Sequence, residues 1–319
     1  MISEQILFGH SHLNQNQKRG AKLNIIIFGG SGFLGSHVAD ALSNAGHKVR
    51  IFDIRASGYL NPSQEMIVGD IMDERAVNNA MEGMDILYNF AGIADIDEAS
   101  KKPLDTVKYN ILGNTILLEA AREHQLKRFV YASTVYVYSN SGSFYRCSKA
   151  ACENYIDVYR KQHGLDYTIL RYGTLYGTRA DERNSVCRFL TQAMSEKKIT
   201  YPGDGSEIRE YINVLDAAKA SVEILSDEFR NEHVIFTGHY PMKVRELFIM
   251  IKEMLKDDIE FEFIPQTTND SMGHYAVTPY TFIPKVGKKY VKHYYTDMGQ
   301  GLLLCMQEIF DKIQTGKKL

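Results

Sequence analysis

The chain has 319 residues, a formal net charge of −2 at pH 7 and an isoelectric point near 6.6. Its composition, 44% hydrophobic and 24% charged, is that of a globular protein with room for a nucleotide-binding domain and a smaller lobe. The small net charge argues against nucleic acid as a partner, and no apolar run is long enough for membrane insertion.

Residues 1–20 are polar and lack the apolar centre of a signal peptide, which predicts a flexible N-terminal extension. The two histidines in this stretch are not interpreted as a metal pair, and no metal site is expected. The cysteines form no CxxC pair and are interpreted as reduced thiols of a cytoplasmic protein.

The first predicted element is a buried strand, 23–29, that ends in a glycine-rich turn. Gly29, Gly32 and Gly35 lead into an amphipathic stretch, 33–45, which predicts a helix. In such a turn one glycine permits the bend, one lets the backbone approach a pyrophosphate, and one allows close packing of helix on strand. The N–H groups that begin the helix then bind the phosphates. The alternative is an ordinary glycine-rich turn between a strand and a helix.

The next strand, 48–54, carries an acid near its end. Asp53 lies 24 residues beyond Gly29, near the distance at which a carboxylate binds the adenosine ribose of a dinucleotide. This acid favours NAD over NADP, although Arg55 could offset the preference by pairing with a 2′-phosphate.

Strand and helix signals alternate as far as residue 171. Strands are expected at 23–29, 48–54, 65–69, 85–90, 127–133 and 167–171, and helices at 33–45, 73–82, 104–123 and 145–163. This alternation predicts an α/β fold with a Rossmann-type doubly wound parallel sheet. Ligands are then expected beyond the carboxyl ends of the strands.

Beyond residue 171 the pattern is less regular and predicts a smaller α+β lobe for the substrate. The expected division is a dinucleotide-binding domain over 21–171, to which 207–230 returns, and a lobe formed by 172–206 and 231–319.

A tyrosine and a lysine open the predicted helix 145–163. Tyr145 and Lys149 are four residues apart and so share one helix face. A phenol with a pKa of about 10 is a poor base at neutral pH, but an adjacent ammonium and the positive helix terminus both favour the phenolate. The pair alone is common in structural helices, whereas the pair after a dinucleotide turn indicates acid–base chemistry.

Further motifs surround this pair. The set comprises the glycines of 29–35, Asp53, 69–71, 89–92, 109–113, 130–138, Tyr145, Lys149, 170–177 and 203–211. Through them, residues 23 to about 225 resemble the extended short-chain dehydrogenase/reductase family, the NAD-dependent nucleotide-sugar epimerases and dehydratases that include the UDP-glucose 4-epimerases.

The resemblance implies roles by position. Cofactor binding would fall to Gly29, Gly32, Phe33, Leu34, Gly35, Asp53, Asp70, Ile71, Ala91, Gly92, Asn110, Tyr145 and Lys149. Thr134, Tyr145 and Lys149 would be catalytic, with Tyr145 taking the proton from a sugar hydroxyl, usually at C4. Substrate binding would fall to Ser133, Thr134, Thr174, Asn184 and Arg209. Ser133 competes with Thr134 for the hydroxyl that bonds the sugar oxygen, and Arg209, the implied diphosphate contact, could instead form a surface ion pair.

Two departures from the family pattern bear on the reaction. The 4,6-dehydratases place Asp-Glu directly after the threonine, where this chain has Val135 and Tyr136, so dehydration is disfavoured. Only 11 residues lead from Thr134 to Tyr145, about half the number usual in the family. The missing loop normally covers the sugar, which predicts a more open sugar pocket.

The implied activity is NAD-dependent oxidation, with or without re-reduction, of a nucleotide-diphosphate sugar in surface-polysaccharide or sugar biosynthesis. A C4 epimerase, a C4 dehydrogenase and a keto-sugar reductase remain open, and a non-catalytic dinucleotide sensor is a further alternative.

The resemblance also implies a homodimer or larger homo-oligomer, in which helices 104–123 and 145–163 pair with their copies. The apolar side chains expected at that interface, unless they face their own sheet, are Ile111, Ile116, Leu117, Tyr155, Ile156 and Tyr159.

Overall fold

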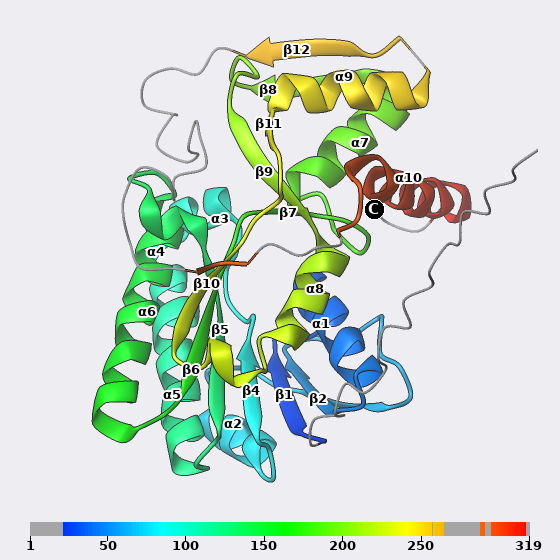
Figure 1. Ribbon diagram of the computed structural model, residues 1–319. Coiled ribbons are helices and arrows are strands. Elements are labelled where there is room, and N and C mark those ends of the chain that lie inside the picture. The colour runs from blue at the N-terminus through cyan, green and yellow to red at the C-terminus, as the bar shows by residue number, and fades with distance from the viewer. Residues whose placement is uncertain (1–21, 257, 265–287, 291–294, 317–319) are drawn as a thin grey trace, which may run out of the picture.

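The computed structural model describes residues 22–256, 258–264, 288–290 and 295–316 (Figure 1). The predicted N-terminal extension, 1–20, lies outside the described residues. Within the described part of the chain, no helix combines the length and the apolar character needed to cross a bilayer.

An eight-stranded parallel sheet forms the larger domain and confirms the predicted fold class. Its strands lie in the order β13-β10-β6-β5-β4-β1-β2-β3. Their bounds are β1 Asn24–Phe28, β2 Lys48–Asp53, β3 Gln64–Val68, β4 Ile86–Asn89, β5 Arg128–Thr134, β6 Tyr167–Tyr172, β10 Glu232–Phe236 and β13 Lys288–Lys289. The order reverses between β1 and β4, and such a reversal opens a crevice at the carboxyl ends of the strands.

Helices cover both faces of this sheet (Figure 1). One face carries α2 (Glu74–Met81), α5 (Gly113–Glu123) and α6 (Ser143–His163), and the other carries α1 (Phe33–Asn44) and α8 (Val214–Glu223). Alternate residues of β1 enter the two layers: Ile26 and Phe28 pack in the first, and Ile25 and Ile27 in the second. Burial on both faces explains why the strand sequences read as continuous apolar runs.

The smaller lobe has its own sheets and core above the carboxyl edge of the large sheet (Figure 1). Its strands are β7 Thr174–Tyr176, β9 Ile208–Asn213 and β11 Pro241–Lys243 in one sheet, with β8 Lys198–Pro202 and β12 Glu260–Ile264 in another. Its helices are α7 Ser185–Glu196, α9 Val244–Leu255 and α10 Met298–Thr315. Phe189, Phe248 and Leu302, one from each helix, meet in the lobe core.

Three segments differ from the expectation. The predicted helix 104–123 is a short α4 (Pro103–Asp105), a π-helix (Thr106–Leu112) and α5, preceded by an unpredicted α3 (Ile96–Lys101). Strands β10 and β13, in the range assigned to the lobe, extend the large sheet, because β10 pairs with β6. Of the returning segment 207–230, α8 packs on the large sheet as expected, whereas β9 belongs to the lobe.

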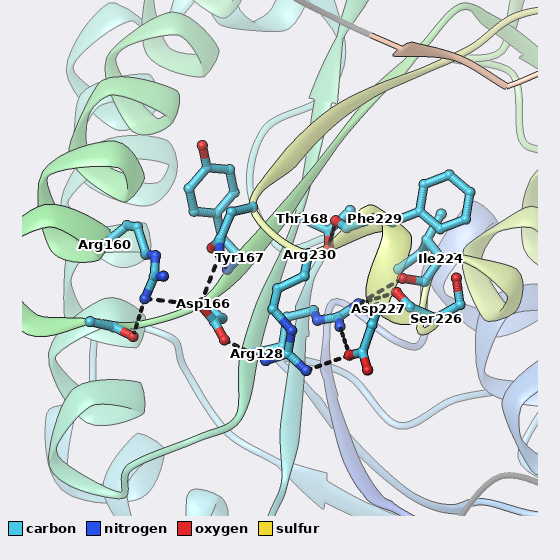
Figure 2. A network of polar contacts seen from close by, with 12 residues as sticks. Arg128, Arg160, Asp166, Tyr167, Thr168, Ile224, Ser226, Asp227, Phe229 and Arg230 are labelled. Carbon is cyan, nitrogen blue, oxygen red and sulfur yellow. Dashed lines mark hydrogen bonds and ion pairs between the residues drawn. The ribbon is translucent and has the colours of Figure 1, made fainter.

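A polar network fixes the amino ends of β5 and β6, opposite the crevice (Figure 2). The buried Arg128 guanidinium donates to the carbonyl oxygens of Ile224 at 2.7 Å and Ser226 at 3.2 Å. Asp227 lies 3.5 Å from Arg128 and 2.6 Å from Arg230. These contacts tie the segment after α8 to β5, far from the strand ends at which a ligand is expected.

Candidate active site

The turn after β1 is packed so tightly that only glycine fits at two positions. Gly29 has a φ of +79°, and a Cβ there would lie 2.6 Å from the backbone nitrogen of Ala91. A Cβ on Gly35 would lie 2.2 Å from the carbonyl oxygen of Gly29. The turn therefore brings the bare backbone of β1 and of the segment after β4 together at the reversal in strand order.

The helix that follows keeps its first donors available. Gly32 is the N-cap residue of α1, and Phe33 and Leu34 begin the first turn. Among the described residues, no side chain caps this end and no acid lies in the first turn. Uncapped N–H groups at a positive helix end suit a pyrophosphate, so this cradle fits a dinucleotide.

Asp53 ends β2 beside the same turn. Its Oδ2 accepts a hydrogen bond from the backbone N–H of Ser31 at 3.0 Å, and its Oδ1 accepts one from that of Arg55 at 3.2 Å. These two contacts fix the carboxylate next to the glycine turn, the position expected of a ribose ligand.

Asp70 and Ile71 follow β3 at the edge of the crevice. Asp70 Oδ1 accepts from the N–H of Met72 at 2.9 Å and so stabilises the turn. Ile71 is 9% exposed and packs against Gly113 of α5, so most of its side chain belongs to the core.

The Asn110 side chain is used entirely within the protein. Its Oδ1 accepts from the N–H of Ile93 at 2.7 Å, and its Nδ2 donates to the Ile93 carbonyl at 3.0 Å and to Ser148 Oγ at 2.9 Å. Gly92 lies so close that a Cβ would be 2.5 Å from Asn110 Oδ1. The amide therefore binds the loop after β4 to α6, and the predicted cofactor contact of Asn110 stays a prediction.

Tyr145 and Lys149 lie in the first turns of α6. Lys149 is buried, and its Nζ donates to the carbonyl oxygen of Ala132 in β5 at 2.7 Å. The same Nζ lies 4.8 Å from the ring centre of Tyr131 and 5.8 Å from that of Tyr145. Desolvation lowers the pKa of Lys149 to about 8. The structure therefore holds a poorly hydrated ammonium beside the Tyr145 phenol, where its charge favours the phenolate.

Thr134 and Ser133, the last residues of β5, make different contacts. Thr134 Oγ1 accepts from the N–H of Tyr136 at 3.2 Å, which leaves its O–H able to donate to a substrate oxygen. Ser133 Oγ instead donates to the buried Glu153 carboxylate at 2.5 Å. The Ser133 hydroxyl is thus engaged below the site, and Thr134 is the better candidate for the substrate contact.

Two predicted substrate residues lie on paired strands of the lobe. Thr174 begins β7, which pairs with β9, and β9 carries Arg209. Arg209 is buried, and its Nη1 donates to the carbonyl of Ile208 at 3.1 Å. Its burial argues against the alternative of a surface ion pair.

Asn184 caps α7 instead of presenting its amide to the crevice. Its Oδ1 accepts from the N–H groups of Val186 and Cys187, and its Nδ2 donates to the carbonyl of Leu175 at 2.8 Å. The side chain therefore acts as a helix cap, and the predicted contact of Asn184 to a nucleotide stays a prediction.

The sequence reasoning missed a buried ion pair behind these residues. Glu153 Oε2 lies 2.8 Å from Arg171 Nη2, and both side chains are almost fully buried. The available signal was the spacing of Glu153, which follows Lys149 by one helical turn and so shares its face of α6.

Comparison with known proteins identifies the family. The family model for the NAD dependent epimerase/dehydratase family matches residues 25–236. The chain belongs to this family. The match confirms the predicted resemblance and, because the family is NAD dependent, the predicted cofactor.

Individual relatives show a range of reactions. A putative UDP-glucose 4-epimerase of Methanocaldococcus jannaschii is 30% identical over 72% of this chain and 81% of its own length. A dTDP-glucose 4,6-dehydratase of Actinoplanes sp. is 27% identical over 61% of this chain and 70% of its own. The UDP-glucose 4-epimerase of Thermotoga maritima, solved with UDP-glucose, is 25% identical and superposes with a TM-score of 0.77 over 91% of this chain and 100% of its own. The chain is therefore similar to enzymes that modify nucleotide sugars.

The buried lysine gives this site a stability signature. Because the pKa of Lys149 falls from its ordinary 10.5 to about 8, the unfolded state binds more protons than the folded state between these pH values. Stability should therefore rise with pH across that window. Across this window, the unfolding free energy of wild type should rise by on the order of 3 kcal/mol more than that of the Lys149→Met variant, at about 1.36 kcal/mol per pH unit.

Denaturant unfolding of the protein without cofactor at pH 7, 8, 9 and 10 measures this difference. The matched control is Lys127→Met, because Lys127 is largely exposed. A constant difference between Lys149→Met and wild type across this range would contradict the burial of the ammonium.

Proposed function

We propose that the protein oxidises the C4 hydroxyl of a nucleotide-diphosphate sugar with NAD, as a 4-epimerase or a C4 dehydrogenase. The observation that carries this proposal is the arrangement of Thr134, Tyr145 and Lys149 at the carboxyl edge of the sheet. The nucleotide-sugar enzymes to which the chain is similar support the substrate class.

Three side chains divide the proton chemistry in this proposal. Tyr145 takes the proton from the sugar hydroxyl, and Thr134 donates a hydrogen bond to the same oxygen and orients it. A shift of the phenol by about three pKa units requires roughly 4 kcal/mol, which the Lys149 charge and the positive end of α6 supply in part. NAD, when bound, supplies the hydride acceptor.

The cofactor would lie along the reversal in strand order. The uncapped start of α1 would hold the pyrophosphate, and Asp53 would bind the adenosine ribose. Lys149 would bond the nicotinamide ribose in addition to its contact with Ala132. On the other side of the crevice, Arg209 would bind the substrate diphosphate, to which a guanidinium fork is well suited.

Dehydration does not fit the residues after Thr134. Val135 is 1% exposed and apolar. The ring of Tyr136 packs edge-on against Tyr145, with 6.4 Å between the ring centres. Neither residue offers a carboxyl group for proton transfer at C5 and C6, so we favour reactions that retain the C6 hydroxyl.

A cytoplasmic location agrees with the cysteines. All four, Cys147, Cys152, Cys187 and Cys305, are free thiols in the structure. Free thiols are typical of a reducing compartment.

Product analysis tests the proposed reaction. The protein is incubated with NAD and a panel of UDP-, GDP-, dTDP- and CDP-sugars, and products are identified by NMR, mass spectrometry and NADH absorbance. We expect either an epimer of unchanged mass or a keto-sugar lighter by two hydrogens. A product lighter by one water would contradict the proposal, as would NAD binding without conversion of any sugar, the behaviour of a sensor.

Removal of one hydroxyl tests the proposed base. Tyr145→Phe keeps the ring, so packing and NAD affinity should survive. Turnover should fall toward the upper end of the range of about 10²–10⁴-fold that is typical of acid–base catalysis. Steady-state rates and calorimetric titration with NAD measure the two effects. Retention of more than about a tenth of the rate would show that another group is the base.

We also propose that the protein is a homodimer, paired through α6 and the π-helix. Of the residues expected at this interface, Leu117, Ile156 and Tyr159 are buried in the core of their own chain, and only Tyr155 is largely exposed. The exposed apolar side chains on these two elements are Val107, Leu112, Phe144, Tyr155 and Val158, and Leu104 of the preceding α4 is exposed as well. They offer a self-complementary surface of the kind that a twofold dimer buries.

A charge placed in that surface tests the dimer. Light scattering at micromolar concentration should give twice the chain mass of 36.3 kDa for wild type and a single chain for Val158→Glu. Phe310→Glu on α10 is the control, because Phe310 is similarly exposed but distant from α6 in the fold (Figure 1). A wild-type monomer, or equal dissociation by both variants, would exclude this interface.

A further inference from the structure

The buried ion pair behind the candidate active site joins three elements. Glu153 of α6 accepts from Arg171 of β6 through Nε at 3.0 Å and Nη2 at 2.8 Å. It also accepts from Ser133 of β5 at 2.5 Å. A buried carboxylate is tolerated when it is paired with a cation and hydrogen-bonded, and here each Glu153 oxygen accepts at least one hydrogen bond.

This cluster lies directly beneath the catalytic side chains. Glu153 follows Lys149 by one turn of α6, and Ser133 directly precedes Thr134. The end of β5 is therefore bound to α6 at two successive residues, through Ala132 to Lys149 at 2.7 Å and through Ser133 to Glu153. These two contacts set the distance between the Thr134 hydroxyl and the Tyr145 phenol.

Arg171 extends the same network to the segment after Thr134. Its Nη1 donates to the Tyr138 hydroxyl at 2.5 Å, and its guanidinium carbon lies 4.8 Å from the centre of the Tyr138 ring. Tyr138 ends the 3₁₀ turn Val135–Tyr138, of which Thr134 is the N-cap residue. The short segment that carries the substrate-facing hydroxyl is thus fixed at both ends by one ion pair.

A histidine completes the coordination of Arg171. His233 Nδ1 of β10 lies 2.6 Å from Arg171 Nη2. A guanidinium can only donate, so this nitrogen must accept and the imidazole must be neutral. Burial and the Arg171 charge lower the pKa of His233, in agreement with that form. The other charged or titratable groups that face this ring are Glu153, Asp157 and Tyr167.

We propose that Glu153 is a positioning residue: paired with Arg171 and bonded to Ser133, it holds Thr134, Tyr145 and Lys149 in one reactive arrangement. This inference rests on the proposed function of these three residues. Glu153 touches neither cofactor nor substrate in this proposal and acts through the end of β5 and through α6.

Glu153 also acts on the charge of Lys149. Desolvation is the main influence and lowers the pKa of Lys149, while Cys152 and Glu153 raise it. Glu153→Gln removes a negative charge near Lys149 and leaves the positive charge of Arg171 uncompensated. The pKa of Lys149 should therefore fall further. Because the proposed base needs the charge of Lys149, the rate should fall as pH rises through the pKa of Lys149. In Glu153→Gln this fall should begin at lower pH, an effect that loss of packing alone would not produce.

The test compares Glu153→Gln with a variant of Arg128, which is buried at the amino end of β5, the strand whose carboxyl end is bonded to Glu153. For Glu153→Gln we expect kcat to fall by about 10²-fold, the cost of a small misplacement of reacting groups, with the KM for the nucleotide sugar and the Kd for NAD little changed. Arg128→Met at the amino end of β5 should lower the melting temperature but leave kcat and its pH profile unchanged (Figure 2). Wild-type kcat and pH profile in folded Glu153→Gln would overturn the proposal, as would an equal loss of kcat in Arg128→Met.

A second variant covers the case in which Glu153→Gln does not fold. Ser133→Ala keeps the ion pair and removes only its contact with β5, and it should also lower kcat without a change in the Kd for NAD. Wild-type kcat in this variant would then overturn the proposal.

One readout does not depend on turnover. In Glu153→Gln, the pH window in which unfolding free energy rises should begin below the pH of about 8 expected for wild type. An unshifted window would refute the inference even if no sugar is found to react. An active Tyr145→Phe enzyme would instead refute the proposed function and leave this shift intact.

Discussion

The structure depends on a steric constraint at one point, where the segments leaving β1 and β4 meet backbone to backbone. Gly29 faces Ala91 with no room for a side chain, and Gly35 faces the carbonyl of Gly29 under the same restriction. Because β1 lies centrally and the strand order reverses beside it, this contact decides where the crevice opens. Asp53, the start of α1 and the first turns of α6 all take their places around that opening.

The wall of the crevice formed by β5, β6 and α6 is built at a cost in stability. It contains a buried lysine and a buried ion pair, groups that an apolar core would replace with little loss or a gain. Lys149 is held in a poorly hydrated position, and in the proposed function its charge acts on Tyr145. Buried charged groups of this kind are expected at the functional site of a protein. The rest of the sheet, with aliphatic and aromatic side chains on both faces, compensates for them.

The sequence predicted the repeating part of the fold well, because continuous apolar strands and periodic helices leave local signals. β1, β2 and β6 lie within a residue or two of their expected bounds. It failed where the partner is distant in the chain. β10 joins the large sheet by pairing with β6, and Asn110 in the π-helix bonds Ile93 and Ser148. The site followed the same rule. Tyr145 and Lys149 share a local helix face, whereas the contacts of Ser133, Asn110 and Asn184 depend on segments that no local pattern reveals.

The lobe is built from several separate segments of the chain rather than from one terminal segment. The chain alternates between lobe and large sheet: β6 is followed by β7 of the lobe, β9 by α8 of the large domain, β10 by β11 of the lobe, β12 by β13 of the large sheet, and β13 by α10 of the lobe (Figure 1). A lobe encoded by one terminal segment could be exchanged between genes by a single recombination. The segments of this lobe alternate with segments of the large sheet along the chain. A single recombination therefore cannot transfer the whole lobe without also replacing part of the large sheet. New substrate preferences in such an architecture must therefore arise by point substitution in place, with the lobe and the sheet inherited together.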